Sequence, residues 1–144
     1  MSADEPAPVH VRPTGTDDAT VEALGKLSEA LEVVEQARGL LYGFHRMSGM
    51  ADLAAGEAVD QLREAGHSDL AARLRQELIG RNVLEGRWTF QVVEEYDDGY
   101  YADFKRLERE ARVALADGKR HLFEAEMKEH RRTHGRPGHE ATPG

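Results

Sequence analysis

The stretch from Arg81 to Tyr96 constrains the fold most, because it holds the only tryptophan and the densest mix of apolar and polar side chains. At the 100° step of a helix, the apolar residues of this region fall on two neighbouring stripes. The first stripe is Leu74, Leu78, Leu84, Trp88, Val92 and Tyr96, and the second is Ile79, Val83, Phe90 and Val93. A helix with so much apolar surface is expected at the centre of a bundle or against a partner subunit.

Four polar residues lie inside this apolar arc, namely Arg81, Asn82, Glu85 and Thr89. A buried charge is costly unless it is paired and hydrogen-bonded. Arg81 and Glu85 are four residues apart, so we predict that they neutralise each other and set the helix register. A ligand or metal site at the same residues is the alternative.

Residues 87–104 also allow a different local structure. They contain several good strand formers, and Asp97-Asp98-Gly99 before two tyrosines is a plausible hairpin turn. An isolated two-stranded hairpin has little stability of its own, however, and no other part of the chain reads as strand. We therefore predict a helix here and keep a short β-hairpin as the alternative.

The apolar spacing elsewhere predicts three more helices. A first helix over 18–47, capped by Thr16, Asp17 or Asp18, carries a seam of apolar residues that Arg38 and His45 continue. A break at 47–50 and a stop at Gly66 delimit a second helix over 50–65. A third helix starts near Ser68 and runs into the tryptophan stretch, with an alternative break near Gly80. A fourth covers about 101–125.

Together these segments predict an all-α protein, an up-down four-helix bundle over residues 18–130. Residues 1–17 and 131–144 are small, polar and rich in proline or glycine. Such a composition buries too little apolar surface to order itself, so we expect disordered tails at both ends.

Composition excludes several functional classes. The chain has no cysteine, which removes disulfides, thiolate metal sites and cysteine nucleophiles. The net charge of −8 argues against nucleic-acid binding. No signal peptide is recognisable and no apolar run approaches the length of a membrane span, so we expect a cytoplasmic protein without membrane contact. Phosphate-binding glycine loops and serine-hydrolase motifs are absent.

The remaining candidates for a site are the polar groups near the tryptophan. We predict the ligand-binding residues Arg38, His45, Arg81, Asn82, Glu85, Trp88 and Thr89. His45 and Glu85 are the candidate metal ligands, as in a carboxylate-bridged, ferritin-like bundle. A lone histidine on an apolar face is more often a core residue than a ligand. No cofactor is identified.

With no catalytic signature, we expect a helical interaction or regulatory protein without catalysis of its own. It would form a homodimer, or bind another protein, through the surplus apolar face of the third helix. A bundle with a buried polar ligand pocket and a metal-binding bundle are the alternatives.

Overall fold

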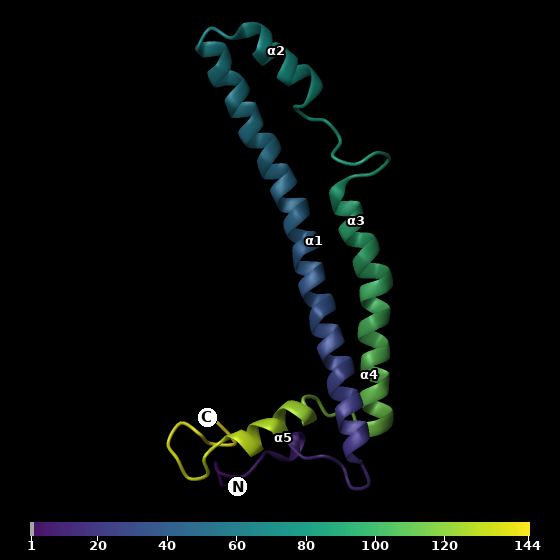
Figure 1. The fold of residues 1–144 in the computed structure, drawn as a ribbon. Coiled ribbons are helices and arrows are strands. Elements are labelled where there is room, and N and C mark those ends of the chain that lie inside the picture. Colours follow the sequence, from purple (N-terminus) through teal and green to yellow (C-terminus); the bar gives the residue numbers. More distant parts are fainter. Residues whose placement is uncertain (1) are drawn as a thin grey trace. The chain divides into compact units, whose positions relative to one another are not determined.

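The structure, a computed structural model, describes residues 2–144, and all regular secondary structure in that range is helical (Figure 1). The elements are η1 Pro8–His10, α1 Asp18–Glu64, α2 Ser68–Glu77, α3 Thr89–Tyr96, η2 Asp97–Tyr101, α4 Ala102–Ala116 and α5 Leu122–Arg131. The prediction of an all-α helical bundle is confirmed, and the hairpin alternative over 87–104 is wrong. None of the described helices is both long enough and apolar enough to cross a membrane.

The chain forms two compact units. Unit 1 comprises the residues up to Val34 together with Ala102–Gly144, and unit 2 comprises Glu35–Tyr101. Helix α1 contributes to both units. The domain limits predicted from sequence, with tails at 1–17 and 131–144, stay predictions.

Helix α1 begins and ends as its sequence predicts. The Thr20 N–H donates to Asp17 Oδ1 at 2.8 Å. Hydrogen bonds from the side chain and the backbone of Thr20 hold the pKa of Asp17 below its ordinary value. At the other end Gly66 takes a φ of +93°, and the N–H of His67 donates to the Leu62 carbonyl at 2.8 Å. This left-handed glycine stop satisfies carbonyls of the last turn.

The predicted break at 47–50 is wrong, because α1 runs unbroken from Asp18 to Glu64. The glycine at position 49 keeps helical geometry and is not among the positive-φ glycines. A glycine inside a helix costs only about 1 kcal/mol. The good helix formers on both sides of it make up for that cost.

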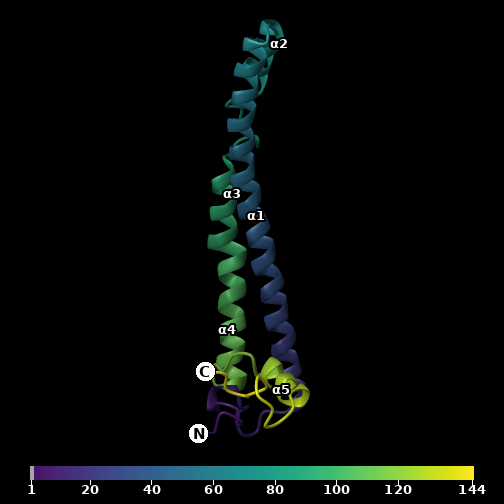
Figure 2. The same ribbon diagram turned by 90° about the vertical axis from the view of Figure 1, so that its left-hand side faces the viewer.

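In unit 1, α4 lies alongside the first turns of α1 in both views (Figures 1 and 2). The core cluster consists of Val21, Leu24, Ala116 and Leu122, with Ala111 packed against it. Helix α5 comes very close to α1 at Gly25, where an added Cβ would lie 2.7 Å from Phe123 Cβ.

The predicted fourth helix over 101–125 is divided into α4 and α5. Asp117, Gly118 and His121 all have positive φ values. The Gly118 N–H donates to the Arg112 carbonyl at 2.9 Å, while Arg112 Nη1 donates to the Gly118 carbonyl at 2.9 Å. This closed turn ends α4 and redirects the chain, although apolar residues continue at helical spacing.

In unit 2, the predicted long tryptophan helix does not form. Helix α2 ends at Glu77, residues 78–88 are irregular, and α3 begins at Thr89. Gly80 and Gly86 take φ values of +73° and +81°, which side chains rarely adopt, so the alternative break near Gly80 is confirmed. The Gly80 N–H donates to Asp52 Oδ1 of α1 at 2.9 Å, which fixes this break.

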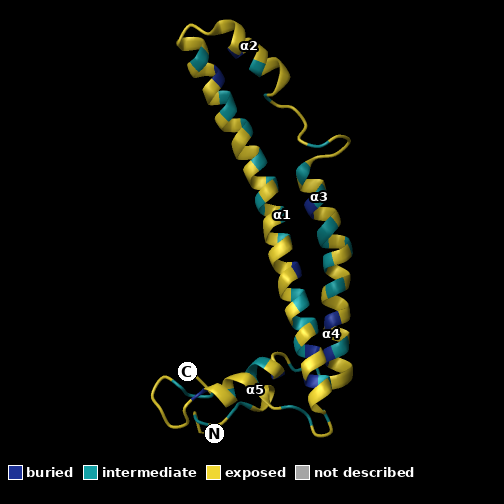
Figure 3. Ribbon diagram, viewed as in Figure 1, coloured by how far each residue is buried: buried dark blue, intermediate teal, exposed yellow. Residues whose placement is uncertain are grey.

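Few residues of unit 2 are buried. Val59, Ala71 and Val93 are its only buried apolar residues, and exposed positions dominate its helices (Figure 3). Trp88, expected at the centre of the fold, is 58% exposed in the chain.

Candidate functional site

The densest set of polar and aromatic contacts in unit 2 lies between α1 and the segment from Thr89 to Tyr101. Arg38 and His45 are seven residues apart on α1, and therefore on one face of that helix. Arg38 Nε donates to Asp97 Oδ1 at 2.6 Å, and its Nη2 donates to Asp97 Oδ2 at 3.0 Å. His45 Nδ1 and Thr89 Oγ1 form a hydrogen bond of 2.8 Å. Arg38 and His45 thus lie together on the face of α1 that continues the apolar seam.

Aromatic rings surround these two polar pairs. The ring of His45 meets the rings of Tyr42 and Phe90 nearly at right angles, with centroid distances of 6.0 and 6.4 Å. The Arg38 guanidinium lies 5.8 Å from the Tyr42 centroid and 5.2 Å from that of Tyr101. Such cation–π contacts favour the charged arginine and hold it in place.

Electrostatics reinforce the same arrangement. The hydrogen-bonded Asp97 carboxylate raises the pKa of Arg38. The Tyr101 hydroxyl donates to Glu35 Oε1 at 2.5 Å, and this hydrogen bond raises the pKa of Tyr101. A tyrosine phenol is protonated at neutral pH, and the raised pKa strengthens that preference, so the group acts as a hydrogen-bond donor. At this site the Arg38 guanidinium is paired with the Asp97 carboxylate, and the Glu35 carboxylate accepts a hydrogen bond from Tyr101.

The structure brings only part of the predicted site together. Arg38, His45 and Thr89 lie at the site just described, and Trp88 approaches it through Phe90, with ring centroids 5.1 Å apart. Arg81, Asn82 and Glu85 are exposed in the irregular segment before α3. No ion pair among residues 2–144 joins Arg81 to Glu85, so their predicted pairing on a buried helix face is wrong.

A ligand-binding role for these seven residues stays a prediction. The candidate metal ligands His45 and Glu85 do not share a metal-binding cluster in the part of the chain that the structure describes, since no three His, Asp or Glu side chains there form one.

Sequence analysis did not predict which residues would pair with each other at this site. Asp97 was read as part of a turn, but Asp97–Tyr101 forms a π-helical turn that directs Asp97 toward Arg38 and Tyr101 toward Glu35. The Asp-Asp-Gly sequence contains no signal for such a role, because the Arg38–Asp97 pairing joins residues 59 positions apart.

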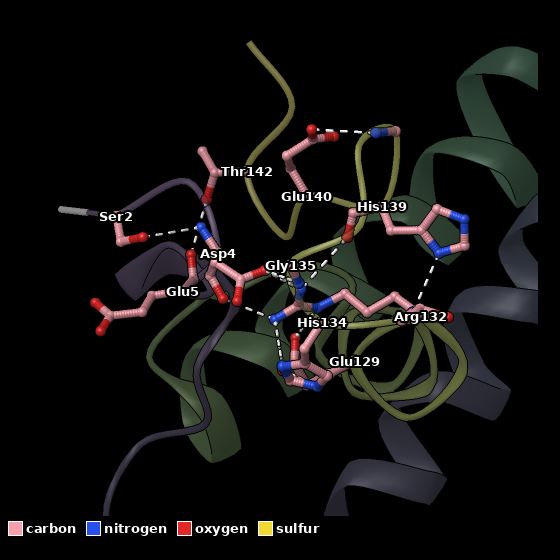
Figure 4. A network of polar contacts seen from close by, with 12 residues as sticks. Ser2, Asp4, Glu5, Glu129, Arg132, His134, Gly135, His139, Glu140 and Thr142 are labelled. Carbon is pink, nitrogen blue, oxygen red and sulfur yellow. Dashed lines mark hydrogen bonds and ion pairs between the residues drawn. The ribbon is translucent and has the colours of Figure 1, made fainter.

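A second polar cluster lies in unit 1, where the buried side chain of Arg132 joins the two ends of the chain (Figure 4). Its Nη1 donates to Asp4 Oδ1 at 2.6 Å, and its Nε donates to Glu129 Oε2 at 2.7 Å. The Thr142 N–H donates to the Ala3 carbonyl at 3.0 Å. Arg132 lowers the pKa of both carboxylates by hydrogen bonding. We name these contacts the Arg132 network. Its donors and acceptors are paired with one another, so the network holds the N-terminal and C-terminal segments together.

Unit 1 also has a groove of about 390 Å³ between α1 and α5. The groove is lined by the residues Glu22, Gly25, Lys26, Glu29, Glu32, Phe123, Glu124 and Met127. Its carboxylates spread over several helix turns without converging on one point, and they form no metal cluster.

A comparison of the chain with family models, with curated proteins and with solved structures gave no match in any of the three.

Proposed function

We propose that this chain is a small helical interaction or regulatory protein of the cytoplasm that acts as a homodimer and carries no catalysis of its own. The main support for this proposal is the exposed apolar surface of unit 2. Its most exposed large apolar residues are Leu40, Met47, Met50, Leu53, Leu70, Leu78, Val83, Trp88 and Tyr100. So many large apolar side chains exposed within one unit favour an interaction surface.

The polar site supports the same proposal. Arg38 is bound by Asp97, His45 by Thr89, and Tyr101 by Glu35. Groups that satisfy one another in this way position helices and leave little reactivity for chemistry. The role of the site in this proposal is to hold α3 and η2 on α1, which keeps the apolar surface presented on a defined scaffold.

Sedimentation velocity on the full chain, over concentrations from about 1 to 100 μM, tests the proposal. We expect the dimer to dominate well below the upper end of this range. A monomer throughout would contradict the homodimer.

A further inference from the structure

Helix α1 carries a second apolar seam within unit 2, distinct from the face that holds Arg38 and His45. The seam consists of the residues Ala37, Leu40, Phe44, Met47, Ala51, Ala54 and Ala58. Successive members are alternately three and four residues apart, which is the heptad spacing of a coiled-coil contact. We call this set the α1 outer seam. At 1.5 Å per residue it extends over roughly 30 Å.

Nothing in the described chain covers the α1 outer seam. All seven residues are exposed, with Leu40 at 77% and Met47 at 68%. None is charged or polar, although exposed helix faces normally carry such residues. Coiled-coil spacing over three heptads without an internal partner points to a helix that comes from outside the chain.

We infer that the α1 outer seam pairs with the same seam of a second copy, with the two helices antiparallel. This inference rests on the proposed homodimer and adds to it the surface and the orientation.

The order of side-chain sizes along the seam favours an antiparallel self-contact. The large residues Leu40, Phe44 and Met47 come first, and the alanines Ala51, Ala54 and Ala58 follow. An antiparallel pair in one register places Leu40 against the partner's Ala58, Phe44 against the partner's Ala54, and Met47 against the partner's Ala51. Each layer then holds one large and one small side chain, the condition for even packing.

Other arrangements pack less evenly. A parallel pair in register opposes Phe44 to the partner's Phe44 and Ala54 to the partner's Ala54, so layers of very different width follow one another. An antiparallel pair shifted by one heptad opposes Phe44 to the partner's Met47 and Ala37 to the partner's Ala54. Overpacked and empty layers both cost free energy.

The available area fits a dimer. The large exposed residues on the seam and its flank are Leu40, Phe44, Met47 and Met50. Their exposed fractions correspond to an area on the order of 500 Å², before the alanines are included, against roughly 800 Å² per partner in a standard interface. One helix pair therefore supplies most of what a stable dimer needs.

The flank of the seam adds complementary charge. Arg46 and Glu57 are exposed, and neither is in an ion pair among residues 2–144. In the stated register, Arg46 and the partner's Glu57 are about five residues, or roughly 7.5 Å, apart along the axis. Because long helical side chains lean toward their own N-terminus, the two charged groups lean toward each other.

Cysteine cross-linking of the full chain tests the orientation without background, because the protein has no cysteine. Variants Leu40→Cys, Met50→Cys and Ala58→Cys are oxidised alone and in mixtures, and also treated with a short bis-maleimide. In the inferred register Met50→Cys lies near the two-fold axis and links to itself. Leu40→Cys and Ala58→Cys do not link alone, since each pair is roughly 27 Å apart, but they link to each other when mixed.

The outcomes separate this inference from the proposed function. Self-linking of Leu40→Cys and of Ala58→Cys means a parallel pair, which overturns the inference and leaves the homodimer standing. A dimer in solution that gives no cross-link at these positions uses another surface, with the same consequence. A monomer at every concentration overturns both.

A substitution pair gives an independent measurement. Leu40→Glu introduces a charge into the contact and is expected to raise the dimer dissociation constant at least tenfold. The control Leu107→Glu makes the same change at an exposed leucine of α4. Both residues are exposed and glutamate is a good helix former, so the helical circular dichroism of each variant should match the parent chain. Equal dissociation constants for the two variants would overturn the inference.

Discussion

The two units bury their apolar residues to different extents. In unit 1, Val21, Leu24, Ala116 and Leu122 form a buried cluster, and polar contacts hold the terminal segments onto α5. In unit 2, the buried apolar residues are few and scattered, whereas leucine, methionine and tryptophan side chains are exposed. The same helix, α1, contributes to both. This difference is the basis of the proposal that unit 2 is completed by a second copy of the chain.

The largest effect is expected at the buried ion pair of unit 1. Arg112 Nε donates to Glu108 Oε1 at 2.8 Å, and Ser28 Oγ donates to the same oxygen at 3.2 Å. Arg112→Met leaves the Glu108 carboxylate buried without its counter-charge, which should cost about 3–5 kcal/mol of unfolding free energy. Urea unfolding followed by circular dichroism measures the loss.

Two controls make that experiment specific. Arg106→Met on the same helix removes an exposed arginine with exposed ion-pair partners and should cost less than about 1 kcal/mol. The double variant Glu108→Leu with Arg112→Met should regain most of the stability, because no buried charge remains. Similar losses of unfolding free energy for Arg112→Met and Arg106→Met would mean that the interior of unit 1 is no better shielded from solvent than that of unit 2.

Glycine-to-alanine substitutions on α1 should have opposite signs in the two units. At Gly25 the new methyl group meets Phe123, so Gly25→Ala should destabilise the protein by about 1–3 kcal/mol through displacement of α5. At Gly56 no heavy atom of the described chain outside the helix lies within 4 Å, so Gly56→Ala should stabilise it by about 0.5–1 kcal/mol. Thermal unfolding of the two variants measures the sign of each change in stability. Stabilisation by Gly25→Ala would contradict the close packing of α5 against α1.

A charge swap tests the antiparallel contact proposed for unit 2. Arg46→Glu should weaken the dimer about two- to fivefold, as is typical of an exposed ion pair. Adding Glu57→Arg should restore the parent dissociation constant, because the swapped charges face each other again across an antiparallel contact. Sedimentation equilibrium at low salt gives the constants. Additive weakening by the two substitutions would argue against the antiparallel register.

The smallest effect is expected from acid at the Arg132 network. The pKa values of Asp4 and Glu129 lie below their ordinary values of 3.8 and 4.5 in the folded chain, because both carboxylates bind Arg132. Their stabilising contribution is therefore complete above about pH 5 and is lost as the pH falls through the lowered folded values. The protection factor of the Thr142 amide, which corrects for the pH dependence of intrinsic exchange, should fall only below about pH 4. An unchanged protection factor down to about pH 2 would contradict a role of the two carboxylates in holding Thr142.

Local patterns accounted for much of the helical structure. Asp17 was recognisable as a cap and Gly66 as a stop, since each acts through backbone groups a few residues away. Arg38 and His45 were placed on the inner face of α1 by heptad spacing alone. The seam predicted their direction, but not their partners.

The errors share one cause. Periodicity extended a helix through Gly86 and Trp88, where the chain leaves helical geometry. The local sequence at 47–50 predicted a break in α1 at Gly49, where the chain keeps helical geometry. A glycine permits both conformations at similar local cost, so contacts made elsewhere decide between them. At Gly80 that contact is the carboxylate of Asp52 on α1, which accepts a hydrogen bond from the glycine N–H.

By itself, the sequence determined the helical class, the capped ends of α1 and the face on which Arg38 and His45 lie, because all three follow from interactions within a few turns of one helix. Only the tertiary structure decided that Asp97 and Thr89 receive those side chains, that Trp88 is exposed, and that Arg132 joins the two ends of the chain. These contacts connect residues 44 to 128 positions apart. Spacing along the chain carries no record of such pairs, since their geometry exists only once the helices have packed.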